Sequence, residues 1–309
     1  MTESRKNKIS LAGFVITFIG AVLFSTKAII VKKAFADIKI DALTLLTLRM
    51  AFSLPFYIVA ALVISGDKSN TRFTRKQWLQ LAGLGLFGYY LSSYLDFEGL
   101  QYVSAGLERL ILFLYPTFVV LINTFFFRQK INRVQKTALL LTYAGIAVAY
   151  FGELQAGISS PGFLWGSLLI FLCAVTYAIY IVGSGKMIPV IGAAKFTAYA
   201  MLSATVFIFI HFALKNKIEL SLLTGAGRWQ YGLLLAIIAT VIPTFLLSNG
   251  MKRIGSNNVA IISSIGPVST IIQAHFFLGE KIFAAQIAGT LLVIAGVLLI
   301  GWKSPGEQG

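Results

Sequence analysis

Residues 102–122 read YVSAGLERLILFLYPTFVVLI, with adjacent charges at Glu108 and Arg109 and a proline at position 116. The apolar stretch continues to Phe127 before the next charge, Arg128. An α-helix needs about 20 residues to cross the hydrocarbon core of a bilayer, and the segment 103–127 is longer than that. The stretch therefore predicts a membrane-crossing helix that carries two charges near one end and a proline in its middle.

The remainder of the 309-residue chain has the same character, with 57% hydrophobic and 12% charged residues. An average soluble domain has roughly 25% charged residues. Apolar runs recur along the whole length, which predicts an all-α integral membrane protein with ten transmembrane helices. The expected spans are 10–31, 42–64, 78–95, 103–127, 137–152, 163–182, 193–214, 229–249, 257–278 and 283–302. The first run is longer than a typical signal sequence, so we expect an uncleaved first helix.

The distribution of Lys and Arg predicts the orientation of these spans. With the N-terminus inside, most of the 26 Lys and Arg residues fall in inside segments, as the positive-inside rule requires. We therefore expect a multi-pass protein of the cell inner (plasma) membrane with cytoplasmic N- and C-termini. This bias accounts for the net charge of +15, and proteins that bind nucleic acid do not devote most of the chain to apolar spans.

The two halves of the chain resemble each other. A shift of 151 positions superposes pairs of identical residues, among them Pro116 on Pro267, Phe126 on Phe277, Lys130 on Lys281, Ile131 on Ile282, Gln135 on Gln286 and Gly145 on Gly296. Five spans per half is an odd number, so the second half would enter the membrane from the opposite side. This predicts two inverted-topology repeats, over residues 1–152 and 153–309, within one transmembrane domain. Such repeats recur among secondary transporters.

A family resemblance agrees with this pattern. Residues 102–122 and the related segment GSNNVAIISSIGPVSTIIQAHFFLGEKI (255–282) resemble the EamA repeat of the drug/metabolite transporter (DMT) superfamily. The shared features are a small-residue entry, a mid-helix proline and a closing LGE-K, which in the first half reads FFRQKI at 126–131. The resemblance implies ten helices, cytoplasmic termini, a central cavity, and export or exchange of amino acids or other small metabolites.

Four charges of the first half lie inside the expected spans and a fifth, Asp96, lies at the end of the third span. A charge within the membrane costs roughly 2.5–3.5 kcal/mol on insertion scales and is a functional candidate by default. The five are Lys27, Arg49, Asp96, Glu108 and Arg109. Neighbouring helix residues point about 100° apart, so Glu108 and Arg109 each need a partner elsewhere. We expect Glu108 to pair with Lys27 or Arg49, and Arg109 to pair with Asp96 at the membrane rim. The alternatives are structural ion pairs between helices, or side chains that extend to the headgroups. One positive charge in excess favours a carboxylate or phosphate on a substrate.

Further candidates come from polar and aromatic residues in both halves. Tyr94 and Tyr115 in the first half, and Asn249 and Asn258 in the second, are candidate substrate contacts, and Tyr177 and Tyr180 share one helix face. Pro116 and Pro267 remove a backbone donor and predict matched kinks beside a cavity, with Pro243 as a possible third. The single cysteine, Cys173, excludes an intrachain disulfide, and no residue pattern suggests a metal site or a cofactor.

These features predict a secondary transporter, an exporter of a small polar metabolite such as an amino acid, that works by alternating access. No GxxxxGK[ST] sequence is present, so a gradient would supply the energy, and protons are a candidate coupling ion with Glu108 as the carrier. A membrane-embedded enzyme acting on a lipid-linked substrate is one alternative, but the chain lacks a dense catalytic constellation. A channel for a small anionic solute is another, but no ring of charges or filter-like loop repeats.

Overall fold

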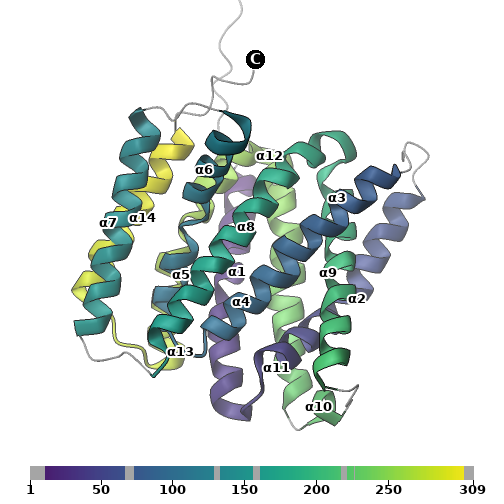
Figure 1. Cartoon of the computed structure of the whole chain (residues 1–309), viewed down its shortest axis with the longest axis horizontal. Coiled ribbons are helices and arrows are strands. Elements are labelled where there is room, and N and C mark those ends of the chain that lie inside the picture. The colour runs from purple at the N-terminus through teal and green to yellow at the C-terminus, as the bar shows by residue number, and fades with distance from the viewer. Residues whose placement is uncertain are drawn as a thin grey trace, which may run out of the picture.

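The computed structural model describes residues 11–66, 73–128, 133–155, 161–216, 221–225 and 227–302, and all regular structure in these ranges is helical (Figure 1). The elements are α1 (Leu11–Ile38), α2 (Ala42–Ser65), α3 (Arg75–Gly85), the π-helix η1 (Leu86–Leu91), α4 (Ser92–Gly99), α5 (Ala105–Leu112), α6 (Tyr115–Phe127), α7 (Arg133–Gln155), α8 (Phe163–Ile191), α9 (Ala193–Asn216), α10 (Ser221–Thr224), α11 (Arg228–Ala236), the π-helix η2 (Ile237–Val241), α12 (Ile242–Ser263), α13 (Gly266–Leu278) and α14 (Ala284–Trp302).

Within the described ranges, seven helical segments are long and apolar enough to cross a membrane. They cover Leu11–Ile38, Ala42–Ser65, Ala105–Phe126, Lys136–Gln155, Phe163–Ile191, Ala193–Asn216 and Arg228–Leu247, and Ala284–Leu299 is a shorter apolar helix. Large apolar side chains such as Val63, Leu140 and Leu164 point outward from these helices. Such surfaces suit lipid, and the chain is a multi-pass membrane protein. The expected count of ten spans stays a prediction.

The segment α12 changes direction inside its bounds. Its residues Leu246 and Ile254 pack against Gly20 and Gly13 of α1, so this part runs alongside α1. Val259 then returns to within 3.5 Å of the Cβ position of Gly250. Nine residues of straight helix would separate two such positions by about 13 Å. The chain therefore turns back between Gly250 and Val259, where the sequence predicted a connection between two spans.

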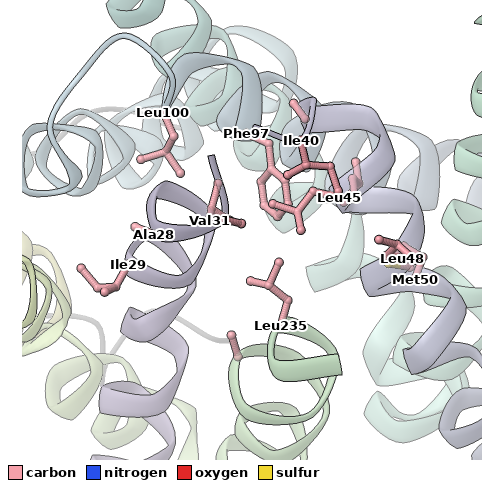
Figure 2. Close-up of a cluster of buried hydrophobic side chains, with 14 of the residues drawn as sticks. Ala28, Ile29, Val31, Ile40, Leu45, Leu48, Met50, Phe97, Leu100 and Leu235 are labelled. Carbon is pink, nitrogen blue, oxygen red and sulfur yellow. The ribbon is translucent and has the colours of Figure 1, made fainter. Parts of the chain in front are cut away.

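The largest group of buried apolar side chains joins the first half of the chain to the second. Figure 2 shows Val31 of α1, Leu45 of α2 and Phe97 of α4 around Leu235 of α11. All four side chains are at most 5% exposed. Burying an apolar side chain of this size contributes about 1.5–3 kcal/mol relative to exposure. These contacts hold the helices that carry the charged side chains described below.

A second close contact joins α7 to α14 at one edge of the bundle (Figure 1). A Cβ at Gly145 would lie 2.5 Å from the carbonyl oxygen of Gly289, and one at Gly289 would lie 2.4 Å from that of Gly145. Only glycine permits this approach, because both backbones are in contact. Small residues at helix contacts are the usual way to pack helices in lipid, where apolar side chains gain little by leaving it.

Several local features recur at the spacing of 151 residues found in the sequence. The π-helices begin at Leu86 and Ile237. Left-handed backbone ends α6 at Arg128 and α13 at Gly279. Two helix interruptions also match, one between α5 and α6 and the other between α12 and α13. The two halves thus share unusual backbone features as well as residues.

The prolines expected in mid-helix occupy helix starts instead. Pro116 lies in the first turn of α6 and Pro267 in the first turn of α13. A proline there lacks only a donor that the first turn would leave unused anyway. The expected kinks are therefore complete interruptions, with α5 ending at Leu112 before α6 begins. Pro243 lies in the first turn of α12, directly after η2.

Candidate functional site

Four buried charged side chains from three helices form the central charged cluster: Lys27, Asp96, Glu108 and Arg109. Lys27 Nζ lies 2.6 Å from Asp96 Oδ2 and 3.5 Å from Glu108 Oε1. Ser104 caps α5 by accepting from Leu107 N at 3.0 Å, which places Glu108 in the first turn. Asp96 and Glu108 are 1% and 0% exposed, so neither carboxylate reaches the surface of the protein.

One predicted partner in this cluster is confirmed and another is wrong. Glu108 pairs with Lys27, one of its two expected partners. Asp96 pairs with Lys27 and not with Arg109, and it is buried where the rim of the membrane was expected. The π-helix η1 precedes Asp96 and adds a residue to one turn, which rotates the following residues by roughly 100° relative to a regular helix. A projection of the sequence that assumes a regular α-helix does not include this rotation, so it places Asp96 on the wrong face.

Arg109 lies among apolar rings and a glycine. Its Cζ is 5.5 Å from the centre of the Phe24 ring and 5.7 Å from that of Phe113. A Cβ at Gly266 would lie 2.9 Å from Arg109 Nη2, so the guanidinium rests against the first turn of α13. No described carboxylate lies within 4 Å of Arg109, and its Nε has no hydrogen-bond partner among the described residues.

Arg49 of α2 occupies a neighbouring site and is bonded only to neutral hydroxyl groups in the described residues. Its Nε donates to Thr240 Oγ1 at 2.8 Å, and its Nη1 donates to Ser93 Oγ at 3.4 Å. Its Cζ lies 5.7 Å from the centre of the Phe97 ring. The side chain is 5% exposed, so Arg49 does not extend to the headgroups. The described part of the chain offers it no ion pair.

Four tyrosines form a continuous group that we call the tyrosine belt: Tyr89, Tyr180, Tyr177 and Tyr115. The hydroxyl groups of Tyr89 and Tyr180 are 2.8 Å apart. Tyr177 and Tyr180, which the sequence places on one face, stack with ring centres 5.7 Å apart. Tyr115 meets Tyr177 edge to face at 5.1 Å. The belt runs from η1 through α8 to the first turn of α6.

Of the other three predicted substrate contacts, two lie away from this belt and the third has a side chain outside the described residues. Tyr94 packs edge to face on His211, with ring centres 4.9 Å apart, in a separate aromatic group with Tyr90. Asn249 is exposed on α12. The side chain of Asn258 lies outside the described residues. The structure therefore brings Tyr115 to the charged cluster and leaves Tyr94 and Asn249 apart.

A second polar group, which we call the end cluster, comprises Lys32, Ser104, Glu153 and Glu280. Lys32 Nζ donates to the carbonyl of Val103 at 2.6 Å and lies 3.8 Å from Glu280 Oε1. Glu280 also accepts from Ala105 N at 3.1 Å, and Ser104 Oγ donates to Glu153 Oε2 at 2.9 Å. The group joins α1, the α4–α5 connection, α7 and the α13–α14 connection at one end of the bundle.

The expected first span ends at residue 31 and left Lys32 in a connecting segment, and neither Glu153 nor Glu280 was a candidate site residue. The structure keeps Lys32 within α1. Glu280 lies in the α13–α14 connection and reaches back to the start of α5. The only sequence signal was the closing LGE-K of the second half. The corresponding segment of the first half, FFRQKI at 126–131, lacks this glutamate. The repeat pattern therefore did not indicate the contact that Glu280 makes with the first half.

A groove of about 490 Å³ lies between α3–η1 and α8. Its walls include Leu84, Phe87, Gly183 and Met187. Gly88, beside Phe87, packs directly on the ring of Tyr180, so the groove adjoins the tyrosine belt. A second groove of about 420 Å³, between α1, α11 and α13, includes none of the belt or central cluster in its lining.

Among the described residues, no group of three or more His, Cys, Asp or Glu side chains is arranged to hold a metal ion. Cys173 of α8 is buried and lies in the electrostatic surroundings of Lys27, Asp96 and Glu108. The chemistry available at the centre is therefore ion pairing, hydrogen bonding and aromatic contact.

Comparison with known proteins identifies relatives over nearly the whole chain. A model of the EamA-like transporter family matches residues 11–151 and 164–302. The uncharacterized transporter YcbK of Bacillus subtilis is 30% identical over 96% of this chain and 95% of its own. An uncharacterized transporter of Archaeoglobus fulgidus is 22% identical over 92% of this chain and 94% of its own. A solved crystal structure that is 21% identical superposes with a TM-score of 0.65, covering 98% of this chain and 99% of the other, and shares the fold.

Proposed function

The chain belongs to the EamA-like transporter family, and from this premise we propose that it is a secondary transporter that exports a small polar metabolite such as an amino acid. The observation that carries the proposal is the central charged cluster, in which Asp96 and Glu108 are at most 1% exposed. Lys27 and Glu108 of this cluster lie inside membrane-length helices. Each intramembrane charge costs roughly 2.5–3.5 kcal/mol, so a structural pair could be replaced by apolar side chains with little loss. A transport pathway gives such charges a use.

Alternating access between two halves is the mechanism that we propose. The matched family regions, 11–151 and 164–302, and the recurring backbone features support two related halves. If each half crosses the membrane five times, the halves have inverted topology, and exchange of their conformations opens a central site to each side in turn. We place both termini in the cytoplasm and the protein in the inner membrane, on the basis of the Lys and Arg distribution.

The end cluster is the contact that we assign to the closed outer gate. Lys32, Glu280 and the start of α5 tie the α13–α14 connection of the second half to the first half. The groove between α3–η1 and α8 is lined by the C-terminal half of α8 and adjoins the tyrosine belt, whereas Gly166 near the start of α8 packs on Tyr102 beside the end cluster. This arrangement suits a conformation that is closed at the end cluster and accessible from the opposite side.

Protons are the coupling ion that we propose. Asp96 and Glu108 lie close together and share one ammonium group, that of Lys27. A proton on one carboxyl allows that group to donate a hydrogen bond to the other. The other groups that face this pair are Arg109 of the same helix, Cys173 of α8 and, beyond Asp96, Arg49 of α2.

Counterflow in proteoliposomes tests the function. Vesicles holding the purified chain are preloaded with a mixture of unlabelled amino acids, and uptake of the labelled amino acids is followed with and without a pH gradient. We expect saturable uptake that depends on preloading and that Glu108→Gln makes insensitive to pH. Lys33→Met, which alters an exposed pair with Asp37, should behave as wild type. Uptake that does not saturate would indicate a channel, and chemical change of the solute would indicate an enzyme.

A further inference from the structure

We propose that the transported metabolite carries a carboxylate, which Arg49 and Arg109 receive, while the tyrosine belt contacts its organic body. The inference rests on the proposed transport function and names the substrate class of the same site. Both guanidinium groups are buried, at 5% and 6% exposure, and neither has a carboxylate within 4 Å among the described residues. The described structure thus contains two buried guanidinium groups that have no carboxylate partner.

The nearby carboxylates are already engaged. Both pair with Lys27, whose Nζ lies 2.6 Å from Asp96 Oδ2 and 3.5 Å from Glu108 Oε1. With Arg49 included, three cations then face two anions, and one positive charge is uncompensated. A buried charge without a partner is strongly unfavourable, since breaking a buried pair costs about 3–5 kcal/mol. A ligand with one negative charge would neutralise the group.

The surroundings of Arg49 favour an incoming carboxylate. Its two hydrogen-bond acceptors among the described residues, Thr240 and Ser93, are neutral hydroxyls. Thr240 belongs to the π-helix η2, where its own hydroxyl donates to the carbonyl of Leu235 at 2.8 Å. π-Helical turns interrupt regular hydrogen bonding and are frequent at functional sites. A guanidinium held by weak neutral acceptors can exchange them for the two oxygens of a carboxylate, which match its fork geometry.

The surroundings of Arg109 indicate the same chemistry. The rings of Phe24 and Phe113 flank its guanidinium without satisfying its Nε, which has no partner among the described residues. The absence of a side chain at Gly266 lets the guanidinium lie directly against the first turn of α13, where a Cβ would lie 2.9 Å from Arg109 Nη2. Aromatic rings attract a cation but accept no strong hydrogen bond from it. The donors of Arg109 therefore remain available to a charged acceptor.

The tyrosine belt connects the two arginines. Tyr89 lies four residues before Ser93, to which Arg49 donates a hydrogen bond. Tyr115 meets the ring of Phe113, which flanks Arg109, with ring centres 6.2 Å apart. Between them, Tyr89 and Tyr180 share a hydroxyl contact of 2.8 Å. Tyrosine offers an apolar ring face and a polar hydroxyl, which suits an organic molecule better than an inorganic anion. The site as a whole therefore fits an organic acid or an amino acid, and it disfavours amines and neutral sugars.

A matched ligand panel tests the inference on the detergent-purified full chain. One pool contains the twenty amino acids and small monocarboxylic acids from acetate to 3-phenylpropionate. The comparison pools contain the corresponding decarboxylated amines, primary amides and alcohols at the same concentrations. We expect only the carboxylate pool to raise the melting temperature, after which single members identify the ligand. An equal rise with the amines or amides, or no rise with any carboxylate, would overturn the proposal.

Variants of the two arginines localise the effect. Arg49→Gln and Arg109→Gln should weaken the active carboxylate at least tenfold, and Arg49→Lys, which keeps the charge but not the fork, should weaken it by a similar factor. Arg228→Gln is the matched control, because Arg228 binds the carbonyl of Leu222 at 2.6 Å, outside the central site. Wild-type affinity in Arg49→Lys and Arg109→Gln would overturn the assignment.

The outcome can be separated from that of the transport proposal. Counterflow of an amine or a neutral sugar in proteoliposomes would support transport and overturn the carboxylate assignment. Stabilisation by a carboxylate that depends on Arg49, without counterflow of that compound, would support the site and overturn transport. Counterflow that is restricted to carboxylates supports both.

Discussion

Removal of Lys27 should destabilise the protein strongly, because this one ammonium group serves two buried carboxylates. Its Nζ lies 2.6 Å from Asp96 Oδ2 and 3.5 Å from Glu108 Oε1. With an effective dielectric constant of about 20, the two gross attractions are roughly 6 and roughly 5 kcal/mol. Desolvation and repulsion between the carboxylates offset much of this sum. Loss of one partner of a buried pair costs about 3–5 kcal/mol, and we expect Lys27→Met to lie at the upper end of that range.

Thermal unfolding of the purified protein measures the effect. A destabilisation of this size should lower the melting temperature by on the order of 10 °C. Lys33→Met is the matched control on the same helix, because Lys33 meets Asp37 at 3.6 Å with side chains 50% and 44% exposed. Exposed pairs of this kind contribute about 0–1 kcal/mol. The control should therefore melt close to the wild type.

A compensated variant distinguishes charge from packing. If uncompensated carboxylates cause the loss, adding Asp96→Asn and Glu108→Gln to Lys27→Met should restore most of the melting temperature. If Lys27→Met melts at the temperature of Lys33→Met, the reasoning about the central charged cluster is refuted. If the triple variant melts lower than Lys27→Met alone, the lysine acts through packing, and the electrostatic account is wrong.

Three further predictions concern the gate, the helix contact at the edge of the bundle and a helix cap. Glu280→Gln should weaken the end cluster and speed labelling of the buried Cys173 by a membrane-impermeant maleimide, whereas Asp37→Asn should not; equal labelling rates would contradict the gate. Gly145→Leu should destabilise by at least about 1–3 kcal/mol in thermal unfolding, because a Cβ there already meets the Gly289 carbonyl, and Val148→Leu on the exposed face of α7 is the control. Asp41→Ala should cost about 0.5–2 kcal/mol in the same assay through loss of the bond from Thr44 N to the α2 cap, and an unchanged melting temperature would contradict that account.

The sequence by itself determined the class of the protein. Apolar runs of membrane length, the excess of Lys and Arg and the spacing between Pro116 and Pro267 follow from composition and order alone. The pairing of Glu108 with Lys27 was also within reach, because a buried acid needs a cation and few were available at similar depth. These conclusions need only the length of a helix and the cost of burying charge.

The tertiary structure decided which charges meet and which do not. Asp96 follows a π-helical turn, and the added residue rotates its helix face toward Lys27, a change that no regular periodicity predicts. Arg49 and Arg109 remain without carboxylate partners in the described structure because the rotations and tilts of packed helices direct both nearby acids to Lys27. Likewise, Glu280 reaches Lys32 and the start of α5 across more than half the chain. Sequence order sets the depth of a side chain along its helix, whereas the partner it faces depends on how whole helices pack against each other.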